Sequence, residues 1–486
     1  MLKNFFDLSS ITFRISHDGG IVAGKSLEET VSKFVGNLIS VGIGRGEIVG
    51  ILSENSIDFV ISIFALWRIG SIPMPISTRL TDAEISTVLS SVPCSTMLTD
   101  LSNASRNITN RVRSLSFMEL SKQNTKKVSD TIERSKDETA VVILTSGSTG
   151  MPKGVQLTFK NLVQSALAGD EFFQHRTEDK WLASLPFYHI GGFSVITRSL
   201  LFGTELVIPT DLNQDTISYY IEKYHPTFAS FVPTQLKRFL ERNSPLKLPL
   251  RRVLLGGGFI DSELVRNAIK AGWPVAKSYG SSETASFIAV LPPEHFDEKP
   301  ESAGAPLRGN KIYIVDDKKN ILGPNESGEI AVEGPSVAKG YVNDDALTAS
   351  KFRKGIYYTG DYGYIDNDGY LYVTARKDEF IISGGEKVNP REVEAAILSH
   401  PQVEDAAVLG LNDPEWGQIV TAVVVPKQRT KITLTDLKEF LRKSLAPYKH
   451  PRKLFMVKSI PRTPLGKVKM KELEKILTDK EKFSSA

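Results

Sequence analysis

The pattern of apolar and polar positions at the start of the chain predicts a β-hairpin followed by a helix. Apolar residues alternate with polar ones over 11–15, a turn follows at 18–20, and Ile21 and Val22 begin a returning strand, which is typical of two antiparallel strands. From 27 to 38 apolar residues recur every three or four positions, as on the buried face of a helix. Ser26 and Glu29 have the spacing of a capping box, so this helix is predicted to begin at Ser26.

Strand-like and helix-like segments then alternate through most of the chain. An apolar run at 48–52 predicts a buried strand. A longer run, 59–76, is broken by Arg68, a glycine and two prolines, which favours a core helix over 56–69 and a strand over 71–76 rather than a membrane span. The same alternation continues over 85–120, 157–170, 181–210, 214–240 and 251–290. A repeated strand–helix order predicts mostly parallel sheets covered by helices.

The pattern changes twice towards the C-terminus. Over about 305–375, short strands such as 311–315 are separated by Gly, Pro, Asn and Asp turns, which predicts a small β-barrel-like subdomain. After it, a helix with Pro390 in its first turn, two strands and another helix predict a compact α+β unit. The predicted fold class is α/β: a large N-terminal domain of parallel sheets, residues 1–377, and a small C-terminal α+β domain, residues 378–486.

Composition narrows the classes of function. A length of 486 residues suggests about three folding units, and 41% hydrophobic with 24% charged residues is ordinary for a soluble globular protein. The net charge of +4 is too small to indicate a nucleic-acid partner. One cysteine, Cys94, excludes an intramolecular disulfide and a multi-cysteine metal site. The chain shows no secretory signal, so the expected location is the cytoplasm, with no stable membrane insertion.

The segment 145–154 has the composition of a phosphate-binding loop. Glycines let backbone N–H groups curve around an anion, hydroxyls add donors and a lysine adds positive charge. The segment differs from the P-loop of the common nucleoside triphosphatases, because Lys153 follows Pro152 and Gly154 stands where a metal-binding Ser or Thr belongs. The candidate phosphate-binding residues are Thr145, Ser146, Gly147, Ser148, Thr149, Gly150 and Lys153.

This loop resembles the signature loop of the acyl-adenylate-forming superfamily, which includes acyl-CoA synthetases, peptide-synthetase adenylation domains and firefly luciferase. Four further motifs of that superfamily follow in the same order along residues 26–475: Tyr279-Gly-Ser-Ser-Glu-Thr284, Tyr358-Thr-Gly-Asp361, Arg376-Lys-Asp378 and Pro464-Leu-Gly-Lys467. The resemblance implies ATP, Mg²⁺ and CoA as the cofactor and co-substrates, and a small-molecule carboxylic acid as the partner. It leaves monomer and homodimer open.

The resemblance assigns most of the nucleotide site. Glu283 is implied as the magnesium ligand, because a hard carboxylate can hold Mg²⁺ against ATP phosphates. Asp361 would accept hydrogen bonds from the ribose diol, and Arg376 would contribute donors near ribose or phosphate. The glycines after a strand at 252–255 would let adenine approach the backbone. The other residues implied for ATP or AMP are Gly256, Gly257, Gly258, Ser278, Tyr279, Gly280, Ser281 and Ser282.

The C-terminal motifs imply a moving domain. Lys467 is the implied catalytic lysine, which stabilises the negative charge that develops as a carboxylate attacks phosphorus. Asp378 is the implied hinge about which the small, mobile domain rotates between the two half-reactions. Gly384 and Gly385 belong to a loop that the second orientation would bring to the CoA side of the site.

Two observations predict the acid pocket: the positions of His189 and Arg198 in the sequence, and a similarity to one branch of the superfamily. His189, in Pro186-Phe-Tyr-His-Ile-Gly-Gly192, would shape the pocket, and Arg198 lies nine residues later, where a positive charge suits a second substrate carboxylate. Several segments are similar to the o-succinylbenzoate–CoA ligase branch of menaquinone synthesis, among them Ile381-Ile-Ser-Gly-Gly-Glu386. The candidate pocket residues are His189, Arg198, Thr284, Ser286 and Ser302. A medium-chain or aryl acid–CoA ligase, and a stand-alone enzyme that charges a carrier protein, are alternatives.

Overall fold

The computed structural model describes most of the chain. The described residues are 8, 11–106, 108, 112–123, 134–146, 152–241, 249–258, 260–376, 381–383, 386–413, 416–427, 432–442, 444–445, 447–463, 468–470 and 472–477. The chain forms two compact units, Met1–Ile312 with Val332–Tyr358, and Tyr313–Ala331 with Thr359–Ala486. The domain boundary predicted at 377/378 stays a prediction, since residues 377–380 lie outside the described residues.

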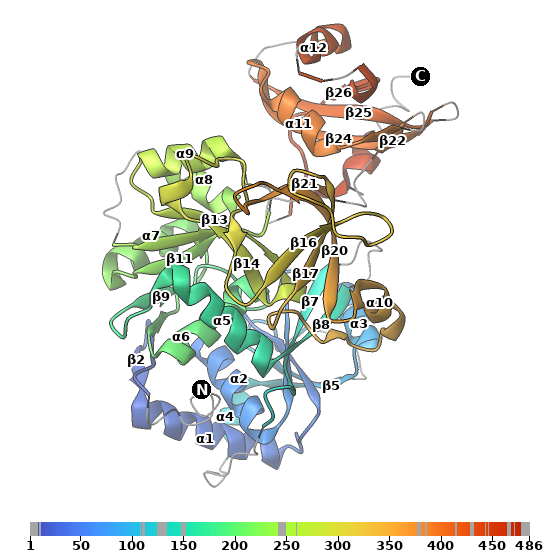
Figure 1. Ribbon diagram of the computed structural model, residues 1–486. Helices are drawn as coiled ribbons and strands as arrows, with labels where there is room; N and C mark the ends of the chain where they lie inside the picture. The colour runs from blue at the N-terminus through green and yellow to red at the C-terminus, as the bar shows by residue number, and fades with distance from the viewer. Residues whose placement is uncertain are drawn as a thin grey trace. The chain divides into compact units, whose positions relative to one another are not determined.

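A nine-stranded, mostly parallel sheet forms the centre of the first unit (Figure 1). Its strands in spatial order are β15 (Ala305–Pro306), β14 (Ser286–Leu291), β13 (Val275–Ser281), β12 (Arg252–Leu255), β11 (Phe228–Phe231), β9 (Lys180–Leu182), β10 (Glu205–Val207), β1 (Arg14–His17) and β2 (Gly20–Ala23). Pairing is parallel from β13 to β1 and antiparallel at both edges. The connecting helices are α5 (Phe159–Phe173), α6 (Ile190–Phe202), α7 (Gln214–Tyr224), α8 (Pro233–Glu241) and α9 (Ser262–Lys270). The predicted parallel architecture is confirmed.

A second sheet of the same unit is parallel throughout. Its order is β4 (Ile72–Ile76), β3 (Ile48–Leu52), β5 (Cys94–Thr99) and β6 (Arg113–Ser116). Its helices are α1 (Gly24–Ser40), α2 (Ile57–Ile69), α3 (Asp82–Ser91) and α4 (Phe117–Ser121). Helix α2 is buried nearly all round, as predicted for a core helix. No helix in the described part of the chain is both long and apolar enough to cross a membrane.

The predicted start of α1 is wrong by three residues. Gly24 is already helical, Ala23 is the N-cap and Ser26 occupies the third helical position. The Ser26 hydroxyl donates back to the Ala23 carbonyl over 2.9 Å. The strand β2 runs directly into the helix, so strand pairing rather than a side-chain cap sets the point at which the helix begins.

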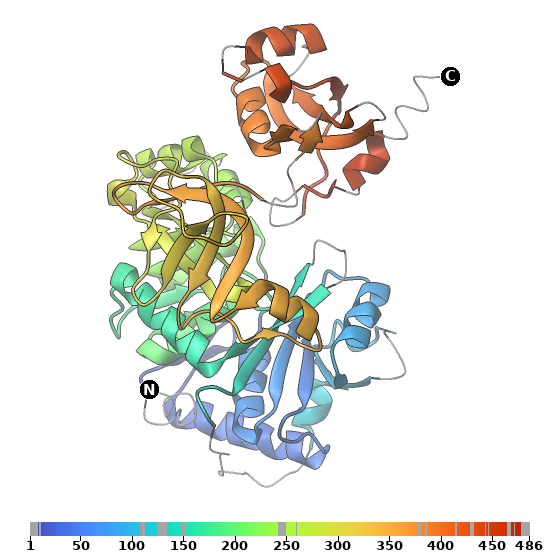
Figure 2. The same cartoon turned by 45° about the vertical axis from the view of Figure 1, so that its right-hand side comes forward.

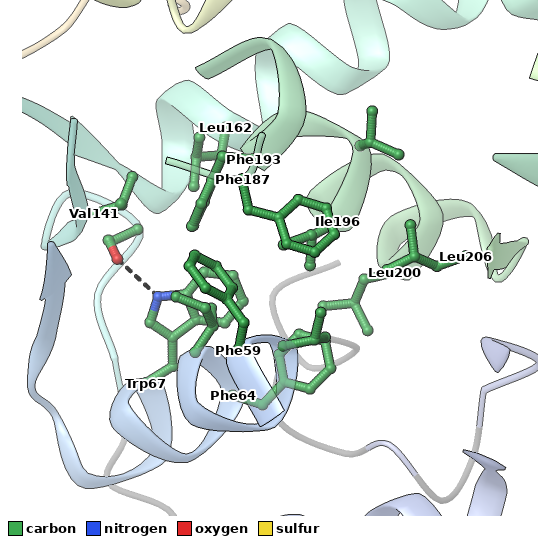
Figure 3. Close-up of a cluster of buried hydrophobic side chains, with 14 of the residues drawn as sticks. Phe59, Phe64, Trp67, Val141, Leu162, Phe187, Phe193, Ile196, Leu200 and Leu206 are labelled. Atoms are coloured by element: carbon green, nitrogen blue, oxygen red, sulfur yellow. Dashed lines mark hydrogen bonds between the residues drawn. The ribbon is translucent and has the colours of Figure 1, made fainter. Parts of the chain in front are cut away.

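An aromatic core joins the two sheets. Trp67 of α2 is fully buried, and its ring packs edge-on against Phe159 and Phe193 at 5.4 and 6.3 Å between centroids. Its indole N–H donates to the Ala140 carbonyl over 2.7 Å (Figure 3), so the one polar atom of this side chain is satisfied. Phe187 packs on Phe59 in the same cluster. This core fixes α5 and α6, which carry residues of the site.

The candidate phosphate loop lies at the tip of a hairpin. Strand β7 (Thr139–Ser146) pairs antiparallel with β8 (Pro152–Thr158), and Ser146 faces Pro152 as the last register pair. Strand β18 (Gly340–Tyr341) pairs with the other side of β8. The chain after the loop is therefore a strand, and Pro152 occupies its first position, where proline is tolerated.

The β-rich stretch predicted near 305–375 is confirmed as a sheet of its own. Its strands are β16 (Lys311–Val315), β17 (Gly328–Glu333), β20 (Ile356–Ile365) and β19 (Phe352–Arg353), and β21 (Leu371–Arg376) pairs with β20. A short helix, α10 (Asp345–Lys351), precedes β19. The short 3₁₀ helices η2 (Ser282–Thr284) and η3 (Pro293–His295) flank β14.

The C-terminal part of the second unit has a five-stranded sheet with apolar residues on both faces. The strands are β23 (Glu386–Val388), β22 (Ile381–Ser383), β25 (Gly417–Pro426) and β24 (Val403–Asp413), with β26 (Lys453–Met456) beside β25. Alternate residues of β24 enter different cores: Ala406 and Val408 pack with α11 (Pro390–Leu398) and α12 (Leu434–Leu441), whereas Ala407 and Leu409 pack with Leu473 and Leu477. Figure 2 shows the orange and red helices on this sheet. A 3₁₀ turn, η5, spans Pro447–Lys449.

Candidate active site

The hairpin β7–β8 places two predicted phosphate-binding residues opposite each other. Thr145 pairs in register with Lys153. The Lys153 ammonium lies 6.0 Å from the centroid of the Tyr341 ring, a cation–π distance. Gly147, Ser148, Thr149 and Gly150 lie outside the described residues, as does the side chain of Ser146.

Glu283 lies in the one-turn helix η2, directly after β13. The Tyr341 hydroxyl donates to Glu283 Oε1 over 2.9 Å, and the Ala338 N–H donates to the Glu283 carbonyl over 2.8 Å. Tyr341 therefore contacts both Lys153 and Glu283, which are 130 residues apart in the sequence.

The surroundings of Glu283 fit a magnesium ion that is shared with ATP. No hydrogen bond to Glu283 Oε2 occurs within the described residues, so this oxygen is available to a cation. In the same residues no group of three or more His, Cys, Asp or Glu side chains could hold a metal by itself. Mg²⁺ commonly binds through one or two carboxylates together with substrate phosphates, which matches one carboxylate beside a phosphate loop.

The residues predicted to contact the nucleobase lie at the ends of β12 and β13. Ser278 donates its hydroxyl proton to the Leu255 carbonyl over 2.9 Å, and this hydroxyl lies directly against Gly256. A Cβ added to Gly256 would come within 2.5 Å of Ser278 Oγ. Gly257 has φ +81°, a conformation that favours glycine. Gly258, Tyr279 and Ser281 are half-buried at the same strand ends, and Gly280 is exposed.

We expect Gly256→Ala to weaken ATP binding about tenfold, because the new methyl group displaces the Ser278 hydroxyl into the space next to the glycines. The dissociation constant for ATP, measured by calorimetry, tests this expectation. Gly44→Ala is a matched control, since its Cβ would meet only Glu47 Oε1, at 3.8 Å. Unchanged ATP affinity in Gly256→Ala would contradict the placement of adenine here.

Arg198 of α6 is fully buried, and within the described residues it makes no ion pair with a carboxylate. Its guanidinium carbon lies 5.8, 5.6 and 4.6 Å from the ring centroids of Phe173, Trp181 and Phe287. Its Nη2 donates to Ser286 Oγ over 3.3 Å. Within the residues that the structure describes, its Nε and Nη1 groups have no hydrogen-bond partner. Burial lowers the pKa of Arg198 to about 9, so the group is still a cation at neutral pH.

The turn that carries Ser286 is strained and anchored from several sides. Ala285 and Ser286 have φ of 52° and 102°, values that side chains other than glycine rarely adopt. The Ser165 hydroxyl of α5 donates to the Ala285 carbonyl over 2.7 Å. Thr284 is buried, and its hydroxyl accepts from the Ser281 N–H over 2.8 Å. Thr284 thus supports the turn from inside.

The two remaining pocket candidates lie near chain bends. Ser302 is fully buried, and its hydroxyl accepts from the Gly304 N–H over 2.9 Å. His189 is half-buried at the N-cap of α6, and its ring lies edge-on to Tyr188 at 4.8 Å. The described geometry brings Arg198 and Ser286 into contact, while no direct contact of either with His189 or Ser302 is found in the described residues.

Asp361 and Arg376 belong to the second unit. They face each other as register partners in β20 and β21, so the two predicted ribose-site residues are neighbours along one sheet. The Asp361 N–H donates to the Thr359 hydroxyl over 2.9 Å. The side chain of Arg376 is not among the described ones.

The predicted lysine, hinge and CoA-side glycines lie outside the described residues: Lys467, Asp378, Gly384 and Gly385. The flanks of the lysine segment are described. Arg462 and Val468 form an antiparallel bridge, and Arg462 makes a two-point ion pair with Asp405 of β24, at 2.7 and 3.2 Å. The two ends of the segment that carries Lys467 are therefore joined to each other, and Arg462 bonds one of them to β24.

Sequence patterns did not reveal Tyr341 or the aromatic rings around Arg198. Tyr341 follows Gly340 in a short strand without any motif chemistry of its own. Phe173, Trp181 and Phe287 look like ordinary core residues in the sequence. The sequence signal for this part of the site was weak: Arg198 is a charged residue in the otherwise uncharged and mostly apolar segment 193–202.

Comparison with known proteins identifies the family. The family model of AMP-binding enzymes matches residues 12–342, and that of the AMP-binding enzyme C-terminal domain matches residues 392–467. The chain belongs to the AMP-binding enzyme family.

Individual relatives are similar over nearly their whole length. A 2-succinylbenzoate–CoA ligase of Geobacillus sp. (strain WCH70) is 36% identical, covering 94% of this chain and 92% of the relative. The o-succinylbenzoate CoA synthetase from Bacillus subtilis, in complex with its acyl-adenylate intermediate, has a TM-score of 0.90 at 32% identity and covers 97% of both chains. A structure of the same synthetase with ATP and a magnesium ion has a TM-score of 0.87 at 33% identity, covering 95% of this chain and 96% of the other.

Proposed function

We propose that the protein is an ATP- and Mg²⁺-dependent 2-succinylbenzoate–CoA ligase that acts in menaquinone biosynthesis. In the first half-reaction a substrate carboxylate oxygen attacks the α-phosphorus of ATP, and the bond to pyrophosphate breaks. In the second, the CoA sulfur attacks the acyl carbon and AMP leaves. A cytoplasmic location stays a prediction from the sequence, and the oligomeric state stays open.

The substrate assignment depends mainly on Arg198. An unpaired guanidinium in an apolar, aromatic environment is costly, and a buried arginine presents a fork of donors that matches a carboxylate. 2-Succinylbenzoate has two carboxylates, so one can bind Arg198 while the other reacts. An acid with a single carboxylate and an apolar body leaves the cation unpaired.

The residues of the two units have separate tasks in this proposal. The loop 145–153 binds the β- and γ-phosphates, Glu283 holds Mg²⁺, and the ends of β12 and β13 receive adenine. When bound, magnesium would neutralise part of the negative charge of the phosphates. Asp361 and Arg376 bind the ribose and α-phosphate side, and Lys467 acts in the first half-reaction. Asp378 is the hinge, and the loop with Gly384 and Gly385 faces CoA. His189, Thr284, Ser286 and Ser302 complete the acid pocket.

A substrate panel tests this function. We expect kcat/KM for 2-succinylbenzoate to exceed that for 4-oxo-4-phenylbutanoate, which lacks only the ring carboxylate, by about 100-fold or more. Octanoate and benzoate should be poorer still. Thioester formation is followed with purified enzyme, ATP, Mg²⁺ and CoA, without any carrier protein. Preference for octanoate or benzoate would favour a medium-chain or aryl acid ligase, and adenylation without CoA turnover would favour an enzyme that charges a carrier protein.

A further inference from the structure

We propose that Tyr341 is a positioning residue that orients Glu283 for magnesium and keeps it separated from Lys153. This inference rests on the proposed function, in which Glu283 holds Mg²⁺ and Lys153 contacts the ATP phosphates. Tyr341 itself is 5% exposed, so it acts through these two residues.

Backbone pairing fixes Tyr341 to the strand that follows the phosphate loop. Tyr341 is the register partner of Val155 in β8, and the Val342 N–H donates to the Gly154 carbonyl over 2.8 Å. The preceding Ala338 N–H binds the backbone of Glu283. The segment 338–342 thus connects the phosphate hairpin with the turn that carries the carboxylate. Tyr341 is also packed edge-on against Phe352, at 5.6 Å between centroids, which limits its movement.

The tyrosine uses a different part of its side chain for each charged residue. The ring faces the Lys153 ammonium at 6.0 Å, and the hydroxyl donates to Glu283 Oε1 at 2.9 Å. In the part of the chain that the structure describes, no ion pair within 4.0 Å joins Lys153 to Glu283. A cation and a carboxylate in one small site would otherwise tend to pair with each other. Separated by the tyrosine, Lys153 stays available to phosphate and Glu283 to the metal.

The hydroxyl also determines which oxygen faces the metal. A hydrogen bond to Oε1 restricts rotation of the Glu283 carboxylate and leaves Oε2 for the cation. Hydrogen bonds of this kind orient metal-binding side chains, and their loss typically costs about 10- to 100-fold in metal affinity or activity. The predicted effect is therefore specific to magnesium rather than to ATP as such.

Tyr341→Phe tests the proposal, since it removes the hydroxyl and keeps the ring under Lys153. ATP binding is measured by calorimetry over a range of Mg²⁺ concentrations and again with EDTA. We expect the Mg²⁺ concentration that half-saturates the gain in ATP affinity to rise about tenfold. ATP affinity in EDTA should be unchanged. A variant that simply damages the fold would lose affinity in both conditions.

Two further variants separate this inference from the proposed function. Glu283→Gln should abolish the magnesium dependence of ATP binding, and adding Tyr341→Phe to it should have no further effect. If Glu283→Gln keeps its magnesium dependence, the metal assignment of the proposed function fails. If Glu283→Gln loses it while Tyr341→Phe matches the parent protein, only the role of Tyr341 is overturned.

Tyr220→Phe is the matched control. Tyr220 is 1% exposed and its hydroxyl donates to Asp18 Oδ1 over 2.5 Å, so the same kind of buried bond is lost. It belongs to α7, and its partner Asp18 follows β1, near the opposite edge of the nine-stranded sheet from β14. Its magnesium dependence should equal that of the parent protein. A tenfold shift in this control as well would overturn the assignment to Tyr341.

Discussion

Lys467→Ala should lose adenylation by about three orders of magnitude and keep most of its thioester formation. As the carboxylate attacks phosphorus, negative charge gathers in a small volume, and an ammonium group delivered there lowers the barrier. The second half-reaction needs no such charge in the same place. Exchange of labelled pyrophosphate into ATP measures the first step, and CoA thioester formation from supplied acyl-adenylate measures the second.

Lys469→Ala is the control for this experiment. Lys469 lies two positions after Lys467 and is half-exposed, and its ammonium group lies 3.2 Å from Glu472 Oε2. The variant therefore removes one positive charge from the same region but leaves Lys467 in place. Both half-reactions should match the parent protein in this variant. Equal loss of both steps in Lys467→Ala, or full pyrophosphate exchange, would refute the role of Lys467.

Arg198→Met should combine a large loss of activity with a gain in stability. Without the guanidinium, kcat/KM for 2-succinylbenzoate should fall about 100-fold or more, because the buried carboxylate of the substrate loses the cation that we propose binds it. The same change removes an unpaired buried charge and fills the space with an apolar chain, which should raise the free energy of unfolding by about 1 kcal/mol or more. Thermal unfolding without ligand and a steady-state substrate panel measure the two effects.

A second buried arginine provides the contrast. Arg68 of α2 is equally buried, but it binds Glu28, and its Nη1 lies 2.6 Å from Glu28 Oε1. Arg68→Met leaves that carboxylate unpaired and should lower the unfolding temperature, with unchanged preference between 2-succinylbenzoate and 4-oxo-4-phenylbutanoate. If Arg198→Met behaves in the same way, Arg198 is a structural residue and the substrate assignment loses its main support.

Much of the fold could be predicted from the sequence because its signals are local. The alternation of apolar strand segments with helix-like periods predicted the parallel sheets. The start of α1 was predicted wrongly, since Ser26 and Glu29 match a capping box while pairing of β2 with β1 sets the boundary. That pairing depends on tertiary structure, which a capping pattern does not contain.

The candidate site was predicted only where its chemistry is concentrated in short motifs. Glu283 and the loop 145–153 stand out in sequence, but their connection through Tyr341 depends on the pairing of β18 with β8 and on a side-chain hydrogen bond across 58 residues. Arg198 was singled out for its charge, whereas its missing counter-ion and its aromatic surroundings needed coordinates. The strained φ angles at Ala285 and Ser286 likewise follow from packing of α5 against the turn, and no residue pattern encodes them.

The Asp405–Arg462 ion pair bears on the energy of switching between the two half-reactions. Both residues, the bridge from Arg462 to Val468 and the segment of Lys467 belong to the same compact unit. If the predicted C-terminal domain, residues 378–486, rotates about Asp378, these bonds travel with it and none of them has to be broken or remade. The free energy of these bonds is then the same in both orientations, so they do not favour either half-reaction over the other.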